Sequence, residues 1–172
     1  MIARKDYESP ESFNEAVREY LLEVGAELVF LVGCVHNIYP IEGISMYNIH
    51  PADPENHGGW NMYSLNPHRR VLLEIIDKIE RGKANIYDRF FTFPTIHEVT
   101  EQYDSGEPFL QAKVEVPTDI IVSIIENVMS KESVDAAASR LQQEVVLPNE
   151  WLMLPTAVKM AAKKIIDKRK AV

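Results

Sequence analysis

An amide, an imidazole and a carboxylate lie in two short polar segments of the chain. Asn48 and His50 stand two residues apart near the end of an apolar run, and Asp104 opens an Asp-Ser-Gly turn further along. An Asn amide can donate to an oxyanion, and an imidazole can donate to the same oxygen and move a proton near neutral pH. A carboxylate beside the imidazole would raise its pKa and orient a water or an amine. Together these groups could stabilise an oxyanion and carry a proton.

Strands are needed to hold these side chains together. Residues 28–32 form a continuous apolar run that predicts a buried parallel strand, and residues 44–49 predict a second strand. Side chains alternate across a strand, so Asn48 and His50 point the same way. Ligands of open α/β sheets bind beyond the carboxyl ends of strands. The polar loops after both strands are therefore expected at one edge of the sheet.

Periodicity, caps and turns predict the remaining elements and an α/β fold in one domain, residues 1–172. They are a helix from Ser9 to Gly25, a helix from 66 to 82, paired strands at 93–99 and 109–116, helices at 133–146 and 155–168, and an apolar segment at 118–129 that fits strand or helix. Trp60 and Trp151 are interpreted as packing residues, and the segment 151–154 as core.

Composition narrows the classes of function. The net charge of −8 argues against a nucleic-acid surface, which needs a basic stripe. The single cysteine, Cys34, cannot form an internal disulfide and favours a reducing compartment. The N-terminal residues show no apolar signal region, and no apolar run is long enough to cross a membrane. We expect a cytoplasmic protein with small-molecule ligands, without nucleic-acid or membrane partners.

The two polar segments resemble the catalytic core of the folate-dependent formyltransferases, above all the branch that formylates glycinamide ribonucleotide. That family carries an Asn-Ile-His-Pro strand end, as at 48–51, and a His seven residues before an Asp-Gly or Asp-Ser-Gly turn, as from His97 to Gly106. The following segment 110–114 is also similar, and the resemblance extends over roughly residues 9–165 with insertions. It implies a truncated Rossmann-like formyltransferase sheet, mixed but mostly parallel, flanked by helices.

The resemblance also implies an activity, a one-carbon transfer of purine biosynthesis. A formyl group would pass from 10-formyltetrahydrofolate to an amine, glycinamide ribonucleotide or a related small amine, with Asn48, His50 and Asp104 in the three catalytic positions. Segments 140–144 and 150–155 look like one family segment split by an insertion, so Gln142 and Glu144 are expected to face the acceptor. The implied folate-contacting residues are Val35, His36, Asn37, Ile38, His97, Thr100, Glu101, Gln102 and Tyr103.

The chain also departs from the family. Members begin with a strand and a Gly-rich loop that binds the acceptor's phosphate at a helix N-terminus, and no such segment is found here. The strand at 28–33 would then be a sheet edge, and exposed edges invite pairing. Another chain, a second copy or the chain's own insertions could cover it.

Three other interpretations stay open. Water could replace the amine, which would make the protein a hydrolase of the formyl donor. The chain could instead be a catalytically inactive binding or regulatory subunit that keeps the fold. A metal enzyme is the third, because histidines and an aspartate could supply ligands, although their spacing matches no standard pattern. The candidate ligands are His50, Asp53, His57, His68 and His97.

Overall fold

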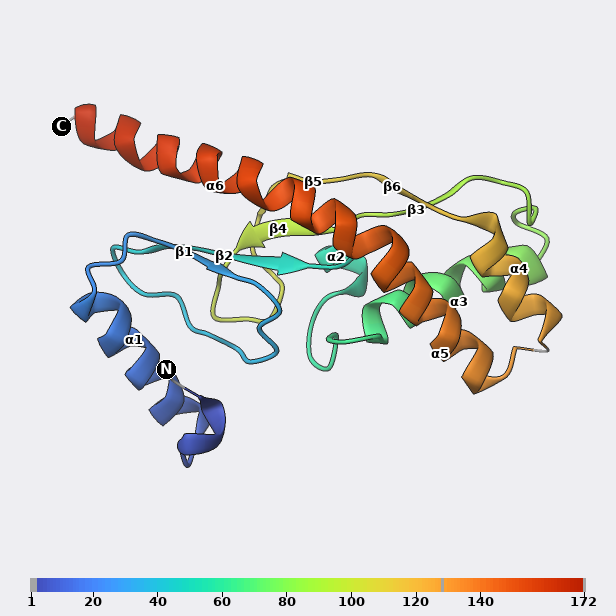
Figure 1. The fold of residues 1–172 in the computed structure, drawn as a ribbon, viewed down its shortest axis with the longest axis horizontal. Coiled ribbons are helices and arrows are strands. Elements are labelled where there is room, and N and C mark those ends of the chain that lie inside the picture. Colours follow the sequence, from blue (N-terminus) through green and yellow to red (C-terminus); the bar gives the residue numbers. More distant parts are fainter. Residues whose placement is uncertain (1–2, 128, 172) are drawn as a thin grey trace.

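A four-stranded sheet lies at the centre of the computed structural model, which describes residues 3–127 and 129–171 (Figure 1). Its strand order is β1-β2-β4-β5. β1 pairs with β2 in parallel, whereas β2–β4 and β4–β5 are antiparallel. The strands are β1 (Leu28–Leu31), β2 (Ser45–His50), β4 (Thr95–Glu98) and β5 (Pro108–Gln111). An α/β fold with a mixed sheet is therefore confirmed.

The expected majority of parallel pairs is wrong. The short connection between β4 and β5 can join only antiparallel neighbours, because a parallel pair needs a crossover of a dozen or more residues. The segment just before β4 and the segment just after β5 pair with each other as a separate two-stranded sheet. Its strands are β3 (Phe90–Thr92) and β6 (Val114–Val116). The predicted pairing of strands around Asp104 is confirmed, with the second strand divided into β5 and β6.

Helices flank the sheet, and several of them pack against one another beside it (Figure 1). α1 begins as predicted: Ser9 and Ser12 form a capping box, and Gly25 follows its end at φ 64°. α6 begins well before Pro155 and contains it. The helical elements are η1 (Arg4–Asp6), α1 (Pro10–Glu23), α2 (Pro54–His57), α3 (Asn66–Glu80), α4 (Thr118–Glu126), α5 (Lys131–Arg140), the π-helical η2 (Leu141–Val146) and α6 (Leu147–Lys170).

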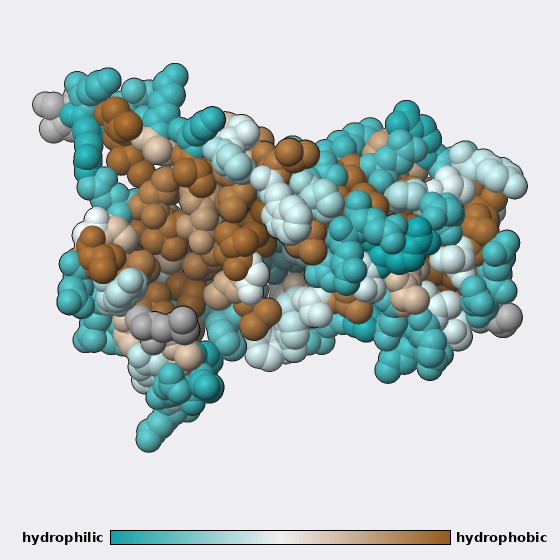
Figure 2. All heavy atoms as spheres, in the orientation of Figure 1, coloured by the Kyte–Doolittle hydropathy of each residue, from teal (hydrophilic) through white to brown (hydrophobic). Residues whose placement is uncertain are grey.

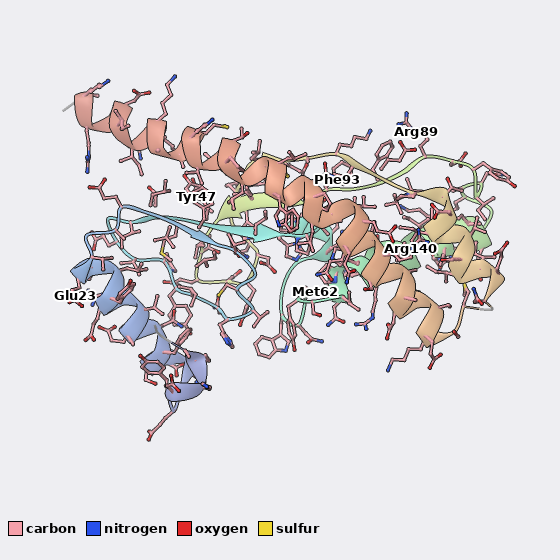
Figure 3. All side chains as sticks on the ribbon, viewed as in Figure 1. Glu23, Tyr47, Met62, Arg89, Phe93 and Arg140 are labelled. Atoms are coloured by element: carbon pink, nitrogen blue, oxygen red, sulfur yellow. The ribbon has the colours of Figure 1, made fainter. Side chains whose placement is uncertain are left out.

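Apolar side chains on both faces of the sheet pack against helices and loops. On one face Tyr47 and Ile96 pack against Met153 and Ala157 of α6 (Figure 3 labels Tyr47). On the other face Phe13 of α1 packs with apolar residues of the loop after β1. Burying a large apolar side chain such as Phe13, Ile96 or Met153 contributes roughly 1.5–3 kcal/mol. A third apolar cluster joins α3, α4, α5 and η2. The π-helical turn thus links the helical cluster to the helix that covers the sheet.

β1 forms one edge of the sheet. Its side chains are apolar on both faces, and all four residues are partly exposed. Figure 2 shows a broad hydrophobic surface in this part of the molecule, between α1 and the C-terminal part of α6. Apolar residues on both faces are typical of an interior strand. A second copy or a partner chain on this edge stays a prediction.

Within the described residues, no helix combines the length and apolar character needed to cross a membrane.

Candidate functional site

Asn48, His50 and Asp104 converge at the end of β2. Asn48 donates from Nδ2 to Oδ1 of Asp104 at 3.3 Å, and Nε2 of His50 lies 3.7 Å from Oδ2 of the same carboxylate. The side chains of His50 and Asp104 are almost fully buried. β2 supplies the first two residues on one side of the strand, and the turn after β4 brings in the third. The sequence prediction of this grouping therefore matches the geometry.

His97 joins the same group from the neighbouring strand. It pairs across the sheet with Asn48, and its Nε2 lies 3.5 Å from Nδ2 of Asn48 and 3.5 Å from Oδ1 of Asp104. Its Nδ1 lies 3.0 Å from the carbonyl oxygen of Glu98, a contact that suits a proton on Nδ1. Asp104 therefore lies between two imidazoles, and His97 belongs with the central residues rather than only with the folate-contacting set.

The backbone holds the Asp104 carboxylate in place. Asp104 has φ 51°, a left-handed conformation that Asp tolerates better than most residues. Gly59 donates its N–H to Oδ2 of Asp104 at 3.0 Å. The turn closes tightly at Gly106, where an added Cβ would lie 1.7 Å from the carbonyl oxygen of Glu98. Only glycine fits there, so the Asp-Ser-Gly pattern has a steric cause.

Burial and neighbouring charge set the protonation of the pair. Burial lowers the pKa of His50 below its usual range, and the nearby Asp104 only partly opposes this. Burial alone would raise the pKa of Asp104, but the contact with His97, whose Nε2 lies 3.5 Å away, the proximity of His50 and the Gly59 N–H lower it overall. The site therefore favours a neutral imidazole beside an ionised carboxylate near neutral pH.

The Nδ1 atom of His50 has two partners on Ala52. It lies 3.2 Å from the backbone nitrogen and 3.1 Å from the carbonyl oxygen of that residue. The backbone N–H can donate to an unprotonated Nδ1, and a protonated Nδ1 can donate to the carbonyl. Each neutral tautomer of His50 therefore has a partner for Nδ1. In one tautomer Nε2 carries a proton that it can donate, and in the other Nε2 can accept a proton.

These residues line a cavity of about 640 Å³. The loop after β1, the segment 99–104, the loop 59–64 and the start of α6 complete its walls. A volume of this size suits a drug-sized organic ligand. Of the predicted folate-contacting residues, those that line it are Val35, His36, Asn37, Ile38, His97, Thr100, Gln102 and Tyr103.

Glu101 is the exception among them. It is exposed and does not line the cavity, but its carbonyl oxygen accepts a hydrogen bond from Nδ2 of Asn37 at 3.2 Å. The backbone N–H of Asn37 also donates to the Tyr103 hydroxyl at 3.1 Å. These bonds join the two predicted folate-contacting segments into one wall.

The opposite wall carries Gln142, as predicted, but not Glu144. Glu144 lies on the outer side of η2, where its carboxylate pairs with Arg140, a residue labelled in Figure 3. Arg140 also binds Asp119 of α4. The expectation that Glu144 faces the acceptor is therefore not met, because the helical register turns it away from the cavity.

Glu150 is a cavity residue that was not predicted from the sequence. It is 9% exposed and lines the cavity; no ion pair or hydrogen bond to its carboxylate is found within residues 3–127 and 129–171. Burial raises its pKa to about 7. The sequence signal is a single acidic residue between the apolar residues of 145–154, and a buried carboxylate without a partner is expensive unless it binds something.

The candidate metal ligands do not gather into one site in the described residues. Among the described parts of the chain, no group of three His, Cys, Asp or Glu residues is placed to hold a metal ion. Asp53 instead caps α2 by accepting from the backbone N–H of Glu55. His57 has Nε2 3.2 Å from Oε2 of Glu74 on α3, at an angle unsuited to a hydrogen bond. His68 is completely buried on α3 and does not line the cavity.

Both tryptophans differ from the packing role expected of them. Trp60 is 81% and Trp151 is 68% exposed, and both line the cavity. Of the segment 151–154, predicted as core, Met153 is buried but Leu152 is exposed. A helix that packs on one face places only every third or fourth residue in the core.

No protein-family model matches the chain. One curated protein is similar to the chain. The chloroplastic phosphoribosylglycinamide formyltransferase of Arabidopsis thaliana is 31% identical to it over 113 residues, which cover 63% of this chain and 32% of that protein. This confirms the resemblance to phosphoribosylglycinamide formyltransferases. The chain spans about a third of the length of the curated relative it matches.

Two solved structures of phosphoribosylglycinamide formyltransferases are also similar. That from Campylobacter jejuni has a TM-score of 0.46 at 18% identity, and that from Bacillus halodurans 0.45 at 22%. Each comparison covers 81% of this chain and 67% of the other. These values are too low to indicate a substrate or a reaction.

Proposed function

We propose that this chain is a formyltransferase that moves the formyl group of 10-formyltetrahydrofolate to a primary amine. The observation that carries the proposal is the convergence of Asn48, His50 and Asp104 on one wall of the cavity. The sequence similarity to the plant enzyme supports the same reaction class. Glycinamide ribonucleotide or a related small amine is the acceptor class.

The reaction needs a stabilised oxyanion. The acceptor nitrogen attacks the formyl carbon, a C–N bond forms, and the carbonyl electrons move to oxygen. The Asn48 amide nitrogen lies 3.3 Å from Oδ1 of Asp104 and 3.5 Å from Nε2 of His97, and one of its N–H groups would turn to that oxygen as the charge develops. His50 donates from Nε2 in the tautomer whose Nδ1 accepts from Ala52. Removing one such donor typically costs on the order of a hundredfold or more in rate.

The proton then moves from the attacking nitrogen to the leaving one. The attacking amine becomes cationic in the tetrahedral intermediate, and the N10 atom of the donor must be protonated before its bond to carbon breaks. In the other tautomer, whose Nδ1 donates to the Ala52 carbonyl, His50 can take the first proton at Nε2 and return it, while Asn48 is the oxyanion donor and ionised Asp104 stabilises the transient imidazolium. The products are a formamide and tetrahydrofolate, with no net change in the enzyme.

The two sides of the cavity suit the two substrates. The wall of 33–38 and 99–104 offers backbone groups for the folate donor. The wall with Gln142 and Glu150 offers an amide and a carboxylate for the hydroxyl and amino groups of an acceptor. The catalytic residues lie between the walls, where the formyl carbon would meet the amine.

Calorimetric titration with a stable 10-formyltetrahydrofolate analogue tests the donor, and a transfer assay with glycinamide ribonucleotide and simpler amines tests the acceptor. We expect saturable binding, and loss of transfer in the His50→Gln variant. His57→Gln, which changes a histidine outside the cavity, is the matched control. Binding without transfer to any amine would favour the inactive binding subunit, and formate release without an amine would favour a hydrolase. No binding by the folded protein would refute the donor assignment.

A further inference from the structure

Trp60 presents a nearly bare indole ring to the cavity. It is 81% exposed, and its ring meets Tyr103 edge to face, with centroids 5.6 Å apart and planes at 78°. Tryptophan is one of the largest apolar side chains, and leaving it in water forgoes its burial energy. An exposed aromatic ring on the wall of a ligand cavity is therefore a candidate contact surface for that ligand.

Hydrogen bonds tie this aromatic pair to the reacting groups. Gly59, directly before Trp60, donates its N–H to Oδ2 of Asp104 at 3.0 Å. The Tyr103 hydroxyl accepts from the backbone N–H of Asn37 on the donor wall. The pair therefore lies between the Asp104 carboxylate and the segment expected to hold folate.

The loop that carries Trp60 is conformationally unusual. Asn61 and Ser64 have φ values of 67° and 56°, and Gly59 has φ 100°. Left-handed non-glycine residues persist only where their surroundings hold them, and they gather at ligand-binding sites. All three residues line the cavity. The loop conformation is consistent with a fixed platform for a ligand.

We propose that Trp60, supported by Tyr103, packs against the benzoyl ring of the folate donor and so selects donors that carry it. This inference rests on the proposed function. The formyl group sits on N10, which is bonded directly to that ring, so the ring must lie beside the reacting carbon. An aromatic platform next to Asp104 is therefore in the right place. The pteridine, which has many hydrogen-bonding atoms, suits the backbone wall instead.

Fluorescence can test the contact directly, because the chain has two tryptophans. Trp151→Phe leaves Trp60 as the single indole, and titration with the stable donor analogue or with p-aminobenzoylglutamate should change its emission saturably. In calorimetry, Trp60→Ala should bind the analogue about three- to tenfold more weakly, the range expected for one aromatic pair. Trp60→Phe should retain most of the affinity, and a simple tetrahydropterin should bind wild type and Trp60→Ala equally.

Tyr87→Ala is the matched control, since Tyr87 is 82% exposed but lies outside the cavity. Its affinity for the analogue should equal that of wild type. Equal analogue affinity of Trp60→Ala and wild type would refute the platform while leaving the donor assignment intact. An equal loss of tetrahydropterin affinity would also refute it, because the variant would then have disturbed the whole loop. No analogue binding to wild type would refute the proposed function and this inference with it.

Discussion

The Nδ2 atom of Asn48 lies 3.3 Å from Oδ1 of Asp104, and this contact determines which way the Asn48 amide points. A carboxylate oxygen can only accept, so the amide must turn its NH₂ group toward Asp104. The same Nδ2 atom lies 3.5 Å from Nε2 of His97, so Asp104 and His97 together fix the NH₂ end of the amide. The carboxylate beside His50 therefore also orients the oxyanion donor.

Asn48→Asp should abolish most of the activity. The substitution keeps the shape of the side chain but removes both N–H donors and places a second negative charge beside Asp104. We expect kcat/KM for formyl transfer to fall by about a hundredfold or more. Circular dichroism should show an intact fold, and Asn85→Asp, which changes an exposed residue outside the cavity, should keep its activity within a fewfold. Activity of Asn48→Asp close to wild type would contradict the role of the amide.

The pH dependence of transfer should report His50. Burial lowers its pKa below the usual 6.5, and Asp104 partly counteracts this. Since the neutral imidazole is the active form, kcat/KM should rise with pH through this lowered pKa and level off above it. Asp104→Asn removes the charge that favours the imidazolium, so its acid limb should move to still lower pH, along with a lower plateau. An acid limb that moves upward, or not at all, would show that another group controls it.

The sequence was sufficient for the parts of the site that local rules control. Strand alternation places Asn48 and His50 on one side of β2, and the Asp-Ser-Gly turn brings Asp104 back to them. The steric requirement at Gly106 makes that turn recognisable. Whether β2 and β4 pair in parallel or antiparallel depends on the path of the chain between them. The periodicity of apolar residues carries no information about that path.

The helical wall was harder to predict. Glu144 and Glu150 lie in one continuous helical segment, and which of them faces the cavity depends on the π-helical turn at 141–146. A π turn has more residues than an α turn, so it shifts the register of all that follows. The expectation for Glu144 came from the resemblance of segment 140–144, which carries no information about this register, and the structure places Glu150 rather than Glu144 on the cavity wall. Trp60 is likewise exposed because of the conformation of its loop, whereas its residue type alone predicts burial.

Gly106→Ala should destabilise the turn that carries Asp104. The added Cβ would lie 1.7 Å from the carbonyl oxygen of Glu98, so the backbone must move. We expect a loss of about 2 kcal/mol or more in the free energy of unfolding, measured with urea, together with reduced transfer. Gly43→Ala is a useful comparison, since its φ of 82° is also left-handed but nothing lies within 4 Å of the added Cβ. A larger loss at Gly43 would contradict the steric explanation.

His68 should make the fold sensitive to acid. Its burial lowers the pKa to about 4, and neither ring nitrogen has a hydrogen-bond partner in the described residues. The unfolded chain binds a proton near pH 6.5, so stability is full above that pH and is lost as the pH falls toward 4. The loss amounts to about 3 kcal/mol. His68→Leu should remove most of it, which urea unfolding at pH 7.5 and pH 4.5 would detect as a smaller drop than in wild type.

Glu150 should have the opposite dependence on pH. Burial raises its pKa to about 7, above the unfolded value of 4.5, so the folded protein holds this proton more tightly than the unfolded chain. Stability from this group is therefore full below pH 4.5 and is lost as the pH rises through 7, by about 3 kcal/mol in all. Glu150→Gln should leave stability near pH 4.5 almost unchanged and raise it at pH 8. The same variant should raise the KM for the acceptor more than that for the folate donor, because Glu150 lies on the acceptor wall. Equal stability of variant and wild type at pH 8 would mean that the carboxylate has a partner or a route to water in solution, and would remove the reason to assign it to substrate.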